Sequence, residues 1–193
     1  MRVIVGLGNP GREYAGTRHN VGFRVADLVG ERLGLHWRKD EDVLFAKSFG
    51  ESPFLVVKPQ TFMNRSGYAV ARFAGYHQVE PEALLVVLDD VDLPLGRVRV
   101  RASGSGGTHN GLKSVVEQLG TTAFPRMRLG VGRGDARRDL ADFVLATFEP
   151  AEEPDVESLI TRAADAAQMF VVEGIQKVMN AYNPEATAPD IAD

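Results

Sequence analysis

Three loops with many polar side chains follow apolar runs in this chain, and they limit the possible folds more than any other feature. The first loop, residues 6–20, reads Gly-Leu-Gly-Asn-Pro-Gly-Arg-Glu-Tyr-Ala-Gly-Thr-Arg-His-Asn and directly follows the apolar run 3–5. Residues 58–64 and 106–111 have similar chemistry. α/β proteins present reactive side chains in such loops, at the carboxyl edge of a sheet. The pattern predicts a site that binds a polar ligand and moves a proton.

Alternating strand-like and helical segments predict an α/β fold: a single domain with a twisted, mixed and largely parallel sheet flanked by helices. Strands are expected at 3–5, 43–49, 54–57, 84–88, 97–101 and 126–131, and the second and third should form a hairpin. Helices are expected at 20–33, 64–76, 110–119 and 154–180. The domain should span residues 1–183, and the polar, proline-bearing stretch 184–193 is predicted to be disordered.

The composition favours a monomeric protein of the cytoplasm. The chain has no cysteine, which excludes disulfides, thiolate metal sites and cysteine nucleophiles, and suits a reducing compartment. No apolar run approaches the ~18 residues of a membrane span, and the N-terminal run is too short for a secretion signal. No apolar heptad demands a partner, so no obligate protein partner is expected.

Basic residues are concentrated in one part of the chain, although the net charge of the whole is −4. Nine basic and two acidic residues lie between Arg97 and Arg138, and in 97–101 and 126–131 arginines alternate with apolar residues. Alternation places such arginines on one face of a strand, where they could form a basic stripe for phosphates. A solvated protein surface explains the same charges equally well.

A nucleotide-binding reading of the first loop has weak support. Gly6-x-Gly8-x-x-Gly11 after a strand matches the dinucleotide fingerprint. The third glycine of that fingerprint has to open a helix, and the residues after Gly11 have no apolar face at helical spacing. A nucleotide-dependent oxidoreductase therefore stays open only as an alternative, beside an RNA-binding module without catalytic activity.

Histidine chemistry remains after other mechanisms are considered. The four histidines lack zinc-site spacing, and neither a serine-hydrolase elbow nor a Walker-type phosphate loop is present. Water activated by a histidine with an orienting aspartate fits what is left. His19 is the better base because it lies in the first loop. Asp89, Asp90 and Asp92 compete as its partner; Asp89 is expected because it is nearest the end of a buried strand, and Asp92 before Leu93-Pro94 is typical of a turn. His36 and His77 are expected at the surface or in packing, and the role of His109 stays open.

Five further side chains have a structural alternative to a role in binding. Asn20, Asn64 and Asn110 each stand where a predicted helix begins, so each could be an N-cap. Tyr14 and Phe62 could stack on bases or sugars, or could simply belong to the core.

Four motifs give the chain a resemblance to bacterial-type peptidyl-tRNA hydrolases, from residue 1 to about 180. They are Gly-Leu-Gly-Asn-Pro-Gly-x-x-Tyr-x-x-Thr-Arg-His-Asn at 6–20, Lys-Pro-Gln-Thr-Phe-Met-Asn-x-Ser-Gly at 58–67, Asp-Asp-x-Asp-Leu-Pro at 89–94, and Gly-Gly-x-His-Asn-Gly-Leu-Lys at 106–113. The resemblance implies hydrolysis of the ester between peptide and tRNA during protein synthesis, releasing both. No cofactor and no metal are expected, and the water should attack without a covalent intermediate.

The same resemblance implies roles for single residues. His19 would activate the water, Asp89 would keep His19 basic, and Asn9 would separate N-blocked peptidyl substrates from free aminoacyl ones. Positions that bind the substrate or the tRNA end are matched by Tyr14, Phe62, Met63, Asn64 and Asn110, and phosphate-binding positions by Arg101 and Arg128. Residues 135–148 would form a mobile lid. Lys58 and Thr108 depart from residues common in the family, but neither carries a proposed role.

Overall fold

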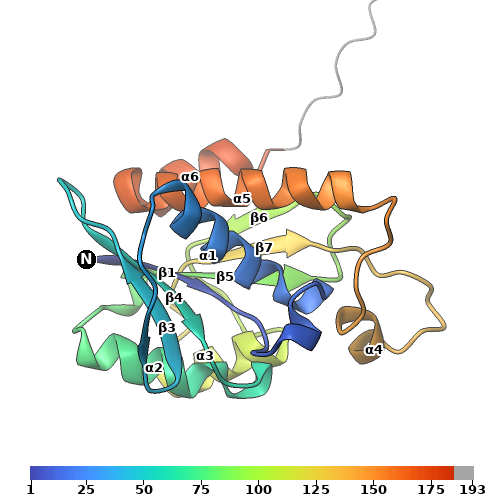
Figure 1. The fold of residues 1–193 in the computed structure, drawn as a ribbon, viewed down its shortest axis with the longest axis horizontal. Helices are drawn as coiled ribbons and strands as arrows, with labels where there is room; N and C mark the ends of the chain where they lie inside the picture. The colour runs from blue at the N-terminus through green and yellow to red at the C-terminus, as the bar shows by residue number, and fades with distance from the viewer. Residues whose placement is uncertain (185–193) are drawn as a thin grey trace, which may run out of the picture.

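A seven-stranded sheet lies between two layers of helices in the computed structural model, which describes residues 1–184 (Figure 1). The strand order is β2-β3-β4-β1-β5-β7-β6. The four central strands are parallel: β1 (Arg2–Gly6), β4 (Phe54–Pro59), β5 (Leu84–Asp90) and β7 (Arg126–Gly130). The edge strands run antiparallel to their neighbours: β2 (Arg38–Asp40), β3 (Val43–Lys47) and β6 (Val98–Arg101).

The predicted α/β fold with a mixed sheet is confirmed, although parallel pairing does not predominate. Three of the six strand pairings are parallel and three are antiparallel. The expected hairpin between β3 and β4 is present, because a short connection can join only antiparallel strands. The parallel centre matters for the site, since it brings the carboxyl ends of β1, β4 and β5 to one edge.

The helices cover the two faces of the sheet (Figure 1). One face is covered by α1 (Val21–Arg32), α5 (Glu153–Glu173) and α6 (Ile175–Tyr182), and the other by α2 (Ser66–Tyr76) and α3 (Asn110–Leu119). Ile4 of β1 packs in the first core, and Val3 and Val5 pack in the second. Such strands are buried on both faces, which explains their uninterrupted apolar sequence.

Short helical elements form much of the chain around the carboxyl edge of the sheet. They are the 3₁₀ helices η1 (Arg12–Tyr14), η2 (Arg18–Asn20) and η3 (Met63–Arg65), and the α-helix α4 (Leu140–Val144); a fourth 3₁₀ helix, η4 (Pro81–Ala83), precedes β5. The predicted helix at 64–76 therefore begins later, at Ser66, because η3 occupies the residues before it.

The single helix predicted at 154–180 is wrong, because Gly174 separates α5 from α6. Its φ of +87° lies in a region that other residues rarely adopt, and the α-helix cannot continue through it. The predicted disorder of 184–193 lies outside the described residues, apart from residue 184. Within residues 1–184, no helix has the length and apolar character to cross a lipid bilayer.

Candidate active site

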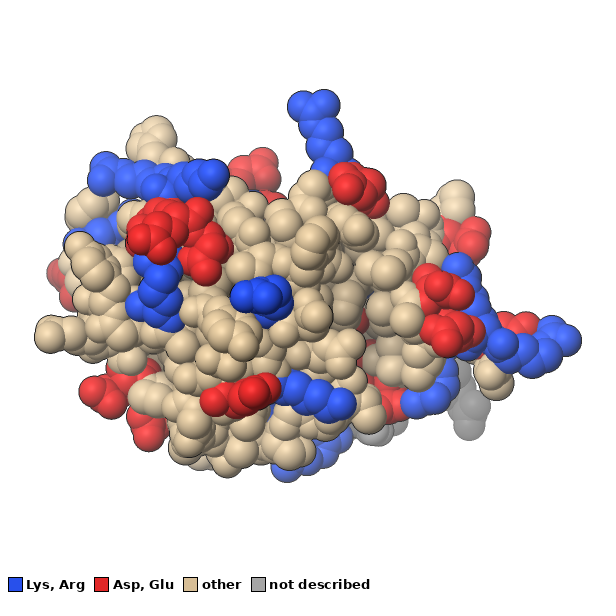
Figure 2. All heavy atoms as spheres, turned by 90° about the horizontal axis from the view of Figure 1, so that it is seen from below, with Lys and Arg blue, Asp and Glu red and all other residues tan. Residues whose placement is uncertain are grey.

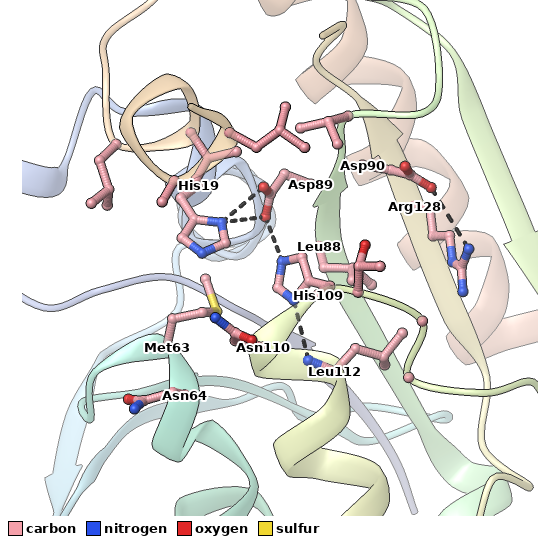
Figure 3. Close-up of a pocket in the computed structure, with 18 of the residues that line it drawn as sticks. His19, Met63, Asn64, Leu88, Asp89, Asp90, His109, Asn110, Leu112 and Arg128 are labelled. Carbon is pink, nitrogen blue, oxygen red and sulfur yellow. Dashed lines mark hydrogen bonds and ion pairs between the residues drawn. The ribbon is translucent and has the colours of Figure 1, made fainter. Parts of the chain in front are cut away.

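Three titratable side chains from different elements meet at the carboxyl edge of the sheet (Figure 3). Asp89 lies near the end of β5, His19 lies in η2, and His109 directly precedes α3. The Nδ1 atom of His19 is 2.9 and 2.8 Å from the two Asp89 carboxylate oxygens, and Nε2 of His109 is 2.8 Å from one of them. The structure thus joins the predicted base to its predicted carboxylate and adds His109, whose role the sequence left open.

The hydrogen bonds assign a tautomer to each imidazole. Nδ1 of His109 accepts from the backbone amides of Gly111 and Leu112 at 3.1 and 3.2 Å, so it carries no hydrogen. In the neutral ring the hydrogen is then on Nε2, which donates to Asp89. His19 Nδ1 likewise donates to Asp89, and this leaves Nε2 of His19 with its lone pair on the side of the ring away from the carboxylate (Figure 3).

Asp89 is a buried carboxylate held in its charged form by the two histidines. Only 2% of the residue is exposed. Burial raises the pKa of a carboxyl group, but the attraction and hydrogen bonds of His109, and then of His19, outweigh it. The pKa of Asp89 consequently lies well below its usual range, and the group is ionised at neutral pH.

Asn9 joins the first and second polar loops. The side-chain Oδ1 of Asn9 accepts a hydrogen bond of 2.7 Å from the backbone amide of Met63. The backbone amide of Asn9 donates to Oδ1 of Asn20 at 2.9 Å. Asn20 Nδ2 returns a bond to the carbonyl of Asn9, also at 2.9 Å. Asn9 lines the pocket, and its Nδ2 has no hydrogen-bond partner among the described residues, so it is a donor available to a bound molecule.

None of the three asparagines suspected of helix capping caps a helix with its side chain. Asn20 precedes α1, but its side chain bonds to Asn9 instead. Asn64 lies in η3, before α2 begins, and Asn110 is the first residue of α3, whose cap is the side chain of His109. Asn64 and Asn110 are both exposed and line the pocket, so capping does not explain them.

The two aromatic residues of the loops lie at the surface rather than in the core. Their rings pack edge to face, with 6.4 Å between the centroids of Tyr14 and Phe62. Phe62 is 59% exposed and lines the pocket, whereas Tyr14 is half-buried. An exposed ring beside a polar pocket offers a stacking surface, and core packing is wrong as an explanation for Phe62.

The pocket has a volume of about 540 Å³ and contains most of the predicted binding residues. His19, Asn9 and Asp89 lie along it with Met63 and Arg128. Tyr14 and Arg101 are not among its lining residues.

One wall of the pocket is apolar and comes from a helix that the sequence did not predict. Leu140, Ala141, Val144 and Leu145, in and just after α4, line this wall. A capping residue was the available signal: Asp139 accepts from the amides of Ala141 and Asp142, as an N-cap should. The helix was missed because it is short and follows a strongly charged stretch.

Arginines of the two alternating strands differ sharply in their surroundings. Arg99 pairs with Arg128 across the ladder and Arg101 pairs with Arg126, so all four project from the same face. Arg101 is exposed, while Arg128 is half-buried and lies 3.7 Å from the carboxylate of Asp90.

The expected basic stripe is wrong for Arg126, which is fully buried. Its guanidinium donates to the carbonyl oxygens of Phe124, Ser105 and Thr122 at 3.0, 3.0 and 3.2 Å. Burial, and then the charge of Arg128, lower the pKa of Arg126 to about 10. This side chain holds the loop around Ser105 in place instead of facing a ligand.

Positive charge is therefore less concentrated on the surface than the sequence indicates. Arg133 pairs with Asp92, and Arg137 pairs with Asp135. On the face covered by α2 and α3, Figure 2 shows basic side chains as separate spots within uncharged and acidic surface. Phosphate contacts on this protein are consequently expected at single arginines rather than on one broad basic patch.

His19, Asp89 and His109 also form the kind of cluster that can hold a metal ion, which the sequence spacing did not reveal. Their possible ligand atoms lie within 4.8 Å of one another. These atoms are already joined by hydrogen bonds of 2.8–2.9 Å, and a metal would have to replace those bonds. Hydrogen bonds of both histidines to Asp89 therefore account for the cluster without a metal.

The other two histidines lie where the sequence predicted. His36 is exposed, and the ring of His77 packs 4.2 Å from that of Phe73 at the end of α2. The nucleotide fingerprint also lacks its required helix, because Gly11 is followed by the 3₁₀ helix η1. Its first glycine instead allows α1 to pack closely, since a Cβ on Gly6 would lie 2.2 Å from the carbonyl oxygen of Gly22.

Comparison with known proteins identifies one family by sequence. The sequence model of the family described as peptidyl-tRNA hydrolase matches residues 3–190. A peptidyl-tRNA hydrolase of Synechococcus sp. is 46% identical over 199 residues, covering all of this chain and 88% of the relative. One of Chloroflexus aurantiacus is 47% identical over 95% of this chain and 100% of the relative. The crystal structure of the Acinetobacter baumannii peptidyl-tRNA hydrolase has a TM-score of 0.88 at 32% identity, covering 95% of this chain and 94% of that one.

Proposed function

The chain belongs to the peptidyl-tRNA hydrolase family, whose members are hydrolases of an ester bond, and on that premise we propose that His19 activates the attacking water. One observation carries this proposal. The Nδ1 atom of His19 is fixed by an ionised, buried Asp89, and His109 holds the same carboxylate from the other side. This arrangement leaves Nε2 of His19 as the acceptor for a proton.

Each step of the reaction uses that nitrogen. Nε2 of His19 takes a proton from water as the water oxygen attacks the ester carbonyl carbon. Asp89 stabilises the imidazolium that forms. When the tetrahedral intermediate collapses, the bond to the ribose 3′ oxygen breaks, and His19 returns the proton to that oxygen. The products are a tRNA with a free 3′ hydroxyl and a peptide with a free carboxyl group, which loses its remaining proton to solvent.

Direct attack by water agrees with the composition of the pocket. An ester has a good leaving group, so a positioned base and a water molecule suffice. Among the described residues that line the pocket there is neither a serine nor a cysteine, and the hydroxyl of Thr108 forms no hydrogen bond with His19 or His109. These observations support a mechanism without a covalent intermediate.

The two sides of the pocket suit the two parts of the substrate. Phe62, which lines the pocket, and Tyr14, which packs against Phe62, suit stacking with the terminal nucleotides of the tRNA. Arg128 in the lining and Arg101 outside it suit contacts with the tRNA phosphates. The apolar wall of α4 suits the side chains of the peptide. Asn9 Nδ2 can donate to the carbonyl oxygen of the peptide bond next to the ester-linked residue. A free aminoacyl group lacks this acceptor, because its amino group is not acylated.

Replacement of the base tests the proposal. His19→Ala should reduce hydrolysis of purified peptidyl-tRNA by about 10²–10⁴-fold, the usual cost of losing a general base. Binding of the product tRNA should change little. His36→Ala is the matched control, since His36 is exposed and lies outside the pocket.

Three outcomes separate the alternatives. Near wild-type turnover of His19→Ala would remove His19 as the base. tRNA binding by a wild-type protein with no hydrolysis would favour an RNA-binding module. Thermal stabilisation by NAD or NADP, without turnover of peptidyl-tRNA, would favour the oxidoreductase.

A further inference from the structure

Arg18, the residue before His19, is almost completely buried and does not belong to the catalytic group. Its side chain is 4% exposed. Nη2 forms an ion pair of 2.9 Å with Glu152, and Nη1 donates to the carbonyl oxygen of Thr147 at 2.8 Å. The carbonyl oxygens of Phe143 and Ala146 lie 3.4 Å from the same Nη1.

Stacking adds to these hydrogen bonds. The guanidinium carbon of Arg18 lies 4.1 Å from the centroid of the Phe143 ring and 5.1 Å from that of Phe148. Phe143 is buried and belongs to α4, the helix that forms the apolar wall of the pocket. One side chain therefore contacts the end of α4 and the residues that follow it.

The backbone strengthens the same connection. The amide of Arg18 donates to the carbonyl of Ala146 at 3.1 Å, and Thr17 forms an isolated β-bridge with Thr147. In the other direction along the chain lie His19, which bonds to Asp89, and Asn20, which bonds to Asn9. Arg18 thus lies between the catalytic base and the wall of the pocket.

We infer that Arg18 is a positioning residue that fixes the α4 wall relative to His19, so that a peptide held against the wall presents its ester to the base. This inference rests on the proposed function, because it needs the peptide to lie along α4. The wall itself adds few buried side chains: Leu140, Ala141 and Leu145 are exposed, and Phe143, which stacks on Arg18, is the buried residue of α4.

Arginine is required by the geometry of the contacts. A planar guanidinium reaches a carboxylate and a carbonyl with different nitrogens while its face covers an aromatic ring. A lysine ammonium has the same charge but cannot do all three. Arg18→Lys should therefore keep the charge but loosen α4, while the backbone contacts of Thr17 and Arg18 remain.

Arg2→Lys is a matched control. Arg2 also donates to two backbone carbonyls, of Phe170 and Val171, at 2.9 and 3.0 Å, and lies 5.5 Å from the Phe170 ring centroid. Those contacts hold the end of α5, away from the residues that line the pocket. The two substitutions remove similar interactions from different places.

Two measurements test the role of Arg18. Hydrogen exchange of the amides of residues 143–147 should become faster in Arg18→Lys and stay unchanged in Arg2→Lys. In hydrolysis assays, KM of Arg18→Lys for an N-acetyl-tripeptidyl-tRNA should rise about tenfold, within the ~10²-fold that misplacement by a remote mutation can cost. KM for an N-acetyl-aminoacyl-tRNA, whose short acyl group reaches less of the wall, should rise much less.

The outcomes distinguish positioning from general stability. If Arg18 only stabilises the fold, Arg18→Lys lowers the folded fraction and therefore reduces kcat, with KM unchanged for both substrates. Either that result or unchanged hydrogen exchange of residues 143–147 would overturn the inference. If Arg18→Lys does not fold, Phe143→Leu, which removes the stacked ring, is the second variant. It should give the same changes in hydrogen exchange and in KM. Wild-type values for Phe143→Leu would overturn the inference equally. The exchange measurement needs no substrate, and failure of the proposed function is recognised separately by full activity of His19→Ala.

Discussion

His109 shows how a single side chain can determine the chemistry of its neighbours. Its Nδ1 is occupied by two backbone amides at the start of α3, so in the neutral ring only Nε2 can donate to Asp89. Asp89 thereby keeps its negative charge in a buried position, and that charge orients His19. A histidine N-cap consequently belongs to the candidate active site, even though it bonds to Asp89 rather than to His19.

The donor of Asn9 gives a prediction about selectivity. Asn9→Ala should lower the ratio of kcat/KM for N-acetyl-aminoacyl-tRNA to that for free aminoacyl-tRNA by about tenfold, the equivalent of one hydrogen bond. Asn9→Asp should do the same, because it keeps an acceptor for the Met63 amide but has no donor. Asn180→Ala, an exposed residue of α6, serves as the control. A changed ratio in Asn9→Ala alone would assign Asn9 to holding the two loops together.

Metal dependence is a second prediction for these residues. Because the possible ligand atoms of His19, Asp89 and His109 are engaged with one another, hydrolysis should continue at an unchanged rate after treatment with a chelator and dialysis into metal-free buffer. Metal content is measured on the same sample. Loss of activity that only added Zn²⁺ restores would mean that the cluster is a metal site.

At the level of elements, the β6–β7 pair shows why a regular pattern can have two outcomes. Alternation in β6 leaves Arg99 and Arg101 exposed, with Val98 and Val100 buried. The same alternation in β7 buries Arg126, because the 103–107 loop and residues 122–124 close over this end of the strand. Of the two arginines in β7, Arg126 therefore holds the 103–107 loop beside the pocket and does not face a ligand.

Arg101 and Arg128 should contribute unequally to the binding of tRNA. Removing one ion pair with a phosphate group reduces the slope of log K against log salt by roughly 0.7–0.9. Arg101→Ala should approach this value for all tRNAs alike, whereas Arg128→Ala should give less, because Asp90 already offsets part of its charge. Arg32→Ala, in α1 on the opposite face of the sheet, is the control. A reduced kcat with an unchanged salt slope would assign these arginines to the fold.

At the scale of the whole molecule, the charged Asp89 links the active site to stability. The pKa of Asp89 is lower in the folded protein than in the unfolded chain, where it is about 3.9. Its charge therefore stabilises the fold above that value, and this stabilisation is lost as the pH falls below about 4.

Asp89→Asn makes the effect measurable, since an amide has nearly the shape of a protonated carboxyl group. The free energy of unfolding of the wild type should exceed that of Asp89→Asn at pH 7, and the difference should shrink as the pH falls below about 4 toward the lower pKa of the folded protein. Denaturant unfolding at several pH values gives both quantities. A difference that is independent of pH would show that the charge of Asp89 does not contribute to stability.

Sequence patterns were enough to predict the class of fold and the pairing of His19 with Asp89. Apolar runs that end in polar loops favour parallel strands, and the carboxyl ends of parallel strands share one edge, so His19 and Asp89 were expected at that edge. Local rules could not decide the rest, because periodicity shows which face a side chain is on but not what covers that face. Packing of distant segments buried Arg126 and left Arg101 exposed, placed Arg18 against α4, and turned His109 toward Asp89. Those contacts join residues far apart in the chain, and only the tertiary structure contains them.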